Sequence, residues 1–142
     1  RLNPNGAEAW RLGAWVSVWG GDIAASLSRV EQAERLDPLS PLQADLLAVR
    51  AAALFYAGRQ DEAIVVARRS LASVPEATTP RRYLTAALAD IGDIEGARRE
   101  LAELLRLQPN SSIRRTTAGH PLRDQTMLRR YLDALRRAGM PE

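Results

Sequence analysis

Proline and glycine punctuate this chain at a nearly constant interval. Four prolines recur every 34, 37 and 34 residues, and each of three glycines stands 17 residues before a proline. The prolines are Pro4, Pro38, Pro75 and Pro109, and the glycines are Gly21, Gly58 and Gly92. An interval near 34 residues, with glycine in the middle and proline at the end, is typical of helix–turn–helix repeats that bury their apolar faces by stacking. The sequence therefore predicts an array of helix pairs, an architecture that usually serves as a binding scaffold.

The residues between these markers agree with paired helices. Each glycine follows an amphipathic run and can adopt the positive φ that ends a helix. Small residues recur just inside the expected second helices, where the two helices of a pair must approach closely: Ser26, Ala63 and Ala97. Proline then ends each unit because it cannot continue a helix.

The register divides the chain into five segments. Residues 7–40, 41–77 and 78–111 are the three repeat units, and residues 1–6 are expected to be the end of a truncated preceding repeat. The second unit has three extra residues, and Ser40-Pro41-Leu42-Gln43 reads as a helix start, which predicts a lengthened first helix. Residues 112–142 are expected to form a linker and a capping helix, which starts after Asp124 and stops at Gly139.

Three short segments in register resemble the tetratricopeptide repeat (TPR). They are Ala7-Glu8-Ala9-Trp10, Ala57-Gly58-Arg59 with Asp61-Glu62-Ala63, and Ile91-Gly92-Asp93 with Glu95-Gly96-Ala97. The resemblance implies an all-α solenoid of three helix pairs plus a C-terminal capping helix. It also implies a protein-interaction module whose first helices line a concave surface.

The register assigns seven residues to this concave surface as a partner-binding site: Arg11, Trp15, Trp19, Asp45, Phe55, Tyr56 and Arg82. Aromatic and arginine side chains dominate binding energy at protein interfaces, so they favour a peptide groove. The alternative is that Trp15, Trp19 and Phe55 pack between neighbouring helices, because large aromatic residues usually serve a core. Some members of the family clamp the C-terminal carboxylate of a peptide on this surface. Only Arg11 and Arg82 match the charge of that clamp.

The composition argues against catalysis by these residues. Cysteine is absent, all 20 basic residues are arginine, and His120 is the only histidine. Disulfides, a phosphate-loop lysine and clustered metal ligands are thus excluded, and no cofactor or metal is expected. Net charge is only +3, so the arginine doublets are interpreted as solvated, partly paired helix faces and not as a nucleic-acid surface. The expected partner is a protein or peptide, with no nucleic acid, membrane or small-molecule substrate.

A second resemblance concerns the whole chain. The Trp10 to Trp15 segment and the ending Leu135-Arg136-Arg137-Ala138-Gly139-Met140-Pro141 are similar to the TPR-like region that follows bacterial class III adenylate/guanylate cyclase domains. This implies a cytoplasmic signalling protein. The alternative function is then a regulatory tail of a cyclase, and the partner could be the protein's own head domain or a second copy. No apolar run approaches the length of a membrane span.

Overall fold

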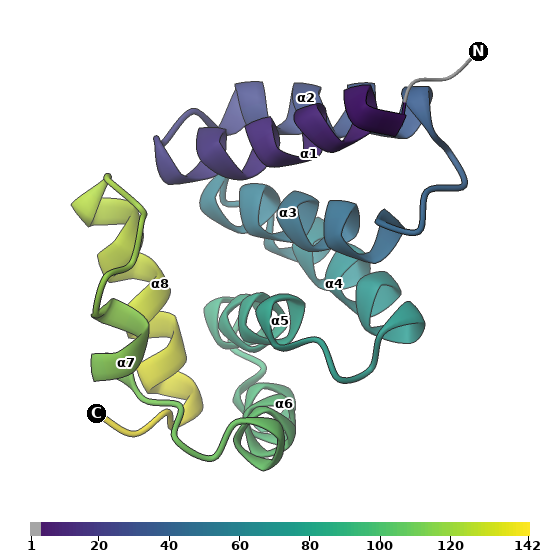
Figure 1. Ribbon diagram of the computed structural model, residues 1–142. Coiled ribbons are helices and arrows are strands. Elements are labelled where there is room, and N and C mark those ends of the chain that lie inside the picture. Colours follow the sequence, from purple (N-terminus) through teal and green to yellow (C-terminus); the bar gives the residue numbers. More distant parts are fainter. Residues whose placement is uncertain (1–3) are drawn as a thin grey trace.

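Helices make up all the regular structure of the described part of the chain, which in the computed structural model is residues 4–142, with side chains from Gly6 onward. They are α1 (Pro4–Trp19), α2 (Ile23–Leu36), α3 (Gln43–Tyr56), α4 (Gln60–Ser73), α5 (Thr78–Asp90), α6 (Ile94–Leu107), α7 (Ile113–Thr117) and α8 (Gln125–Ala138). The first six form three pairs, and the first helix of each later pair packs on the pair before it (Figure 1). The predicted all-α solenoid with a terminal helix is confirmed.

The turn inside each pair has the geometry that the glycines predict. Gly21, Gly58 and Gly92 have φ values of 86°, 79° and 87°, a region that side chains with a Cβ rarely adopt. The second helices then begin with polar caps in two of the three pairs. The carboxylates of Asp22 and Asp93 accept hydrogen bonds from backbone N–H groups of the first turn of α2 and α6.

Small buried residues hold the two helices of each pair close together. Ser26 on α2 is fully buried, and its hydroxyl donates to the carbonyl oxygen of Ala14 on α1 at 2.9 Å. Ala63 and Ala97 occupy the matching places on α4 and α6 and are equally buried. The close approach of the two helices therefore depends on a side chain of one or two heavy atoms.

We expect Ala97→Leu to lower the free energy of unfolding by about 1–3 kcal/mol, because the added atoms would overpack the α5–α6 contact. Urea denaturation followed by circular dichroism measures this loss. An unchanged unfolding midpoint would show that the contact has room for the larger side chain.

One sequence-based expectation about a helix boundary differs from the structure. The first helix of the second pair is not lengthened by nearly a turn, since α3 has 14 residues, one more than the 13 of α5 and fewer than the 16 of α1. The extra residues lie mainly in the connection 37–42, which is longer than the matching connection 74–77. There the hydroxyl of Ser40 accepts a hydrogen bond from the N–H of Leu42 and closes a turn, so the helix starts only at Gln43. At the other end, Pro4 is the first residue of α1, and the expectation that residues 1–6 are the end of a preceding repeat stays a prediction.

The terminal helix α8 stands across one side of the array (Figure 1), and together with the residues just before it contacts all three pairs. Its Arg130 donates to the carbonyl oxygen of Phe55 at the end of α3, at 3.1 Å. Arg130 and Arg137 both pair with Asp90, the last residue of α5. The N–H of Arg123, just before α8, donates to the carbonyl oxygen of Trp19 at the end of α1. The arginines of α8 therefore lie at the C-termini of α3 and α5, where positive charge is favourable. In this way α8 covers the ends of these first helices.

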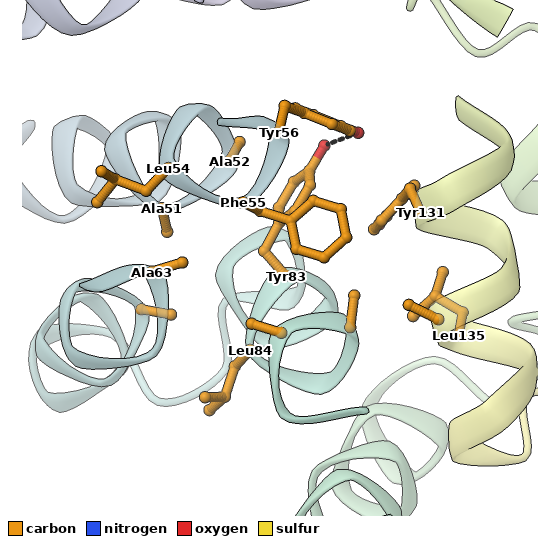
Figure 2. Packing of buried hydrophobic residues seen from close by; sticks show 14 of the residues in the cluster. Ala51, Ala52, Leu54, Phe55, Tyr56, Ala63, Tyr83, Leu84, Tyr131 and Leu135 are labelled. Carbon is orange, nitrogen blue, oxygen red and sulfur yellow. Dashed lines mark hydrogen bonds between the residues drawn. The ribbon is translucent and has the colours of Figure 1, made fainter. Parts of the chain in front are cut away.

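Four aromatic rings form the centre of the core where α3, α5 and α8 meet. Phe55, Tyr56, Tyr83 and Tyr131 are all buried, and Figure 2 shows their rings gathered between the three helices. The hydroxyl groups of Tyr56 and Tyr83 form a hydrogen bond of 2.8 Å, while the rings of Tyr83 and Tyr131 stack with centroids 4.8 Å apart. This cluster joins the terminal helix to the repeats.

Candidate functional site: a groove on the concave face

An open groove of about 770 Å³ lies on the side of the array that α1, α3 and α5 line. These helices contribute Trp15, Trp19, Asp45, Thr79, Arg82 and Tyr83. The rest of the lining comes mainly from the end of α6 and the segment that joins it to α8: residues 108–111, 115, 116 and 118–121, together with Tyr131. The groove is therefore bounded by the repeats on one side and by the C-terminal segment on the other.

Two tryptophans form an aromatic wall of this groove. The rings of Trp15 and Trp19 are one helical turn apart on α1 and stack with centroids 5.8 Å apart and an interplanar angle of 25°. The indole N–H of Trp15 donates to a carboxylate oxygen of Asp45 on α3 at 3.2 Å. Because both rings remain partly exposed, they can contact a bound molecule while Asp45 fixes the orientation of Trp15.

Arg11 is engaged within the protein. Its guanidinium donates to Glu8 on the same helix at 2.6 Å and also to Asp45, and its side chain is 17% exposed. The hydrogen bond to Glu8 is the main reason that the pKa of Arg11 is raised, and the bond to Asp45 adds to it. Arg11 does not line the groove. Its predicted contact with a partner is replaced by a supporting role behind Asp45 and Trp15.

Phe55 and Tyr56 also differ from the prediction that they face a partner. Phe55 has no exposed surface, and Tyr56 is buried against Tyr83 and Tyr131. Burial raises the pKa of the Tyr56 hydroxyl well above its usual value, so the group stays neutral. For Phe55 the alternative of packing between helices is therefore the one observed. The reason is α8, which covers the end of α3.

Two arginines from opposite sides of the groove carry its positive charge. Arg82 on α5 donates to the side-chain oxygen of Gln108, and Arg115 on α7 is exposed. Neither forms an ion pair with a carboxylate of the described residues. Arg82 is among the predicted site residues, whereas Arg115 is not, because it belongs to the doublet Arg114-Arg115 and the sequence favours a solvated surface for the arginine doublets. The segment also contains the expected turn Gly119-His120-Pro121.

His120 lies at the same edge of the groove and holds the segment before α8. Its Nδ1 accepts a hydrogen bond from the N–H of Leu122 at 3.2 Å, and its ring lies 6.0 Å from that of Tyr131. Burial lowers the pKa of His120, and the nearby charge of Arg82 lowers it further. The ring of His120 is therefore expected to be neutral, because its Nδ1 accepts a hydrogen bond and because its pKa is lowered.

Comparison with known proteins gives structural neighbours only. No family model matches the chain, and no curated protein matches its sequence. Among solved structures, the first TPR domain of human RPAP3 has a TM-score of 0.69 and 19% identity, covering 94% of this chain and 95% of that chain. The first TPR of Spaghetti (RPAP3), bound to the HSP90 peptide SRMEEVD, has a TM-score of 0.68 and 18% identity, covering 95% and 97%. The chain has the TPR fold.

Within this TPR fold, α1, α3 and α5 are the first helices of their pairs, and the groove lies on the surface they share. Neither neighbour supports the resemblance to the region that follows a cyclase domain. No helix of residues 4–142 is long and apolar enough to cross a membrane. In the same residues, no group of three or more histidine, aspartate or glutamate side chains could hold a metal ion.

We expect the stability of this TPR domain to fall as the pH drops below about 6.5, the usual pKa of histidine, and His120 to contribute. Because the folded state lowers the pKa of His120, the unfolded chain binds its proton first, and acid favours unfolding. His120→Asn keeps an acceptor for the N–H of Leu122 but cannot titrate. Thermal unfolding at pH 5 and pH 8 should therefore differ less for His120→Asn than for the wild type. An identical pH dependence would contradict the assignment.

Proposed function

We propose that the chain is a protein-interaction module whose concave groove binds an acidic segment of a partner protein. The observation that carries the proposal is the combination, in one open groove, of a stacked tryptophan pair and two arginines that lack carboxylate partners among the described residues. The carboxylate of Asp45, also in the groove, is already engaged by Arg11 and Trp15. The uncompensated charge of the lining is therefore positive.

The chemistry of these side chains favours a peptide with carboxylates beside an apolar residue. The planar guanidinium groups of Arg82 and Arg115 can each hold a carboxylate through two parallel hydrogen bonds. The tryptophan rings offer a large, rigid apolar surface next to them, and such surfaces supply much of the binding energy at interfaces. The structural neighbour from Spaghetti is bound to SRMEEVD, a peptide with three acidic residues and a methionine. It supports this peptide chemistry by analogy of fold.

A titration with that peptide tests the proposal. Binding of SRMEEVD and of SRMQQVN, in which amides replace the three side-chain carboxylates, is measured by isothermal titration calorimetry. Three proteins are compared: the wild type, Arg82→Ala plus Arg115→Ala, and Arg68→Ala plus Arg69→Ala. The last is the matched control, since it removes the same charge from exposed positions on α4 that do not line the groove. We expect the groove variant to lose affinity at least about tenfold, since charge-assisted hydrogen bonds contribute about 1.5–3 kcal/mol each.

The control variant should bind SRMEEVD like the wild type, and SRMQQVN should bind more weakly than SRMEEVD. If both double variants lost the same affinity, binding would depend only on the net charge of the protein, and a site in the groove would be contradicted. Equal affinities for the two peptides would contradict the acidic chemistry. The finer predictions from the sequence, that the partner is a head domain of the same protein or a second copy and that the chain follows a nucleotide cyclase, stay predictions.

A further inference from the structure

A second surface, on α1 and away from the groove, is apolar without being covered. Leu12 is 50% exposed and Val16 is 63% exposed, and Ala9 on the same face is also exposed. No charged residue occurs between Leu12 and Gly21. Elsewhere on residues 6–142, large exposed apolar side chains stand singly on separate elements, such as Leu39 and Val65. The side chain of Arg29 on α2 lies beside Gly13 at one edge of this face. Ala9, Leu12 and Val16 form an exposed apolar patch on α1, and a patch of this kind marks an interaction surface.

The repeat register shows what such a face does in the rest of this molecule. The register assigns Ala9, Leu12 and Val16 equivalent residues in the two later units. They are Leu46, Val49 and Ala53 on α3, which lie 37 residues further along, and Pro80, Tyr83 and Ala87 on α5, which lie another 34 residues along. All six are buried. The helices that carry them pack on the pair before: α3 contacts α1 and α2, and α5 contacts α3 and α4. In both later units this face is thus covered by a preceding helix pair, and at Tyr83 the ring of Tyr131 on α8 adds to the cover.

We propose that the apolar face of α1, formed by Ala9, Leu12 and Val16, is a repeat junction that takes the second helix of a further helix pair of the same type. The sequence of residues 1–4 fits this occupant. Arg-Leu-Asn-Pro repeats the pattern with which two second helices end, Arg-Leu-Asp-Pro at residues 35–38 and Arg-Leu-Gln-Pro at residues 106–109. A head-to-tail stack of two copies lacks a matching surface, because α8 packs on α5 and α6 at the other end.

The inference can be tested by supplying such a pair. In this variant a second copy of residues 38–71, which contain α3 and most of α4, is added immediately before Arg1. Arg1–Pro4 then follows the second helix of the added pair, as the register requires. This helix pair is suitable because α4 packs on the equivalent face of α5. Hydrogen exchange of residues 9–20, which occur once in the extended chain, is measured by mass spectrometry, together with thermal unfolding. We expect exchange in α1 to slow by about tenfold or more and the unfolding midpoint to rise.

Variants in the original α1 and α4 then assign the effect to the face. Leu12→Asp plus Val16→Asp should remove both gains, while Val65→Asp, an equally exposed valine on α4, should keep them. Gains that survive Leu12→Asp plus Val16→Asp would overturn the proposal, and so would an unchanged exchange rate in α1. An added pair that stays unfolded by circular dichroism would also overturn it, since the same pair folds against α5. Sedimentation showing a dimer of residues 1–142 that Leu12→Asp plus Val16→Asp dissociates would assign the face to a second copy instead.

Discussion

Removal of residues 122–142 is expected to lower the free energy of unfolding by more than about 5 kcal/mol, enough to unfold most of the chain at 25 °C. The deleted segment contributes eight buried side chains to the core: Leu122, Leu128, Tyr131, Leu132, Ala134, Leu135, Ala138 and Met140. Each large apolar side chain among them stabilises the fold by about 1.5–3 kcal/mol. Without α8, the ring of Phe55 and the apolar faces of α5 and α6 would meet water.

The deletion also leaves a carboxylate without its main partners. Asp90 is 16% exposed and pairs with Arg130 and Arg137 of α8, so after the deletion only Gln60 would hold it. Circular dichroism, urea denaturation and sedimentation of residues 1–121 measure the loss. Arg129→Ala in the full chain is the control, since it changes an exposed side chain of the same helix. A truncated protein that stays monomeric with the unfolding midpoint of the full chain would contradict a capping role.

The repeats could be predicted because their signals are local. A glycine with positive φ ends each first helix, and the interval between glycines fixes the length of a unit whatever its neighbours are. The start of α8 follows the same logic, since the carboxylate of Asp124 accepts from the N–H groups of Thr126 and Met127. Its end at Gly139, with φ of 102°, is equally local. Such features need no knowledge of the tertiary structure.

The position of α8 could not be predicted, because it depends on residues far apart in the sequence. Arg137 and Asp90 are separated by 47 residues, and Arg130 and the carbonyl group of Phe55 by 75. The spacing of four residues within α8 would also allow a pair between Asp133 and Arg137, one turn apart. In the structure Asp133 pairs with Arg136 at 2.9 Å, which frees Arg137 to reach Asp90. Either pairing satisfies helix geometry, and only the packed neighbour selects one.

The candidate site was predicted in part for the same reason. The register places Trp15, Trp19, Asp45 and Arg82 on the concave side, and all four line the groove. The register does not show which concave residues a later segment covers, so it leaves open whether Phe55 faces a partner or packs between helices, as it does in the structure. Nor does it show which charges neutralise one another. That Arg11 pairs with Asp45, which lies 34 residues away, follows from the stacking of α1 on α3.

Phe55→Ala is expected to lower the free energy of unfolding by about 3–5 kcal/mol, the usual cost of removing a fully buried phenylalanine ring. The ring of Phe55 has centroid distances of 5.3 Å, 5.9 Å and 5.8 Å to the rings of Tyr56, Tyr83 and Tyr131. The guanidinium of Arg130 lies 5.4 Å from its centroid. Alanine would leave a cavity where α3, α5 and α8 meet and would remove a cation–π contact that holds α8.

Urea denaturation of the wild type, Phe55→Ala and Phe55→Leu separates these effects. Leucine keeps much of the buried volume but no aromatic face, so its loss should be clearly smaller than that of alanine if the cavity dominates. Equal losses for both variants would instead assign the stability to ring–ring and ring–arginine contacts. Because Phe55 is buried, a folded Phe55→Leu should bind the acidic peptide like the wild type. A large loss of affinity without a change in stability would mean that Phe55 reaches the partner after all, as its register on α3 first suggested.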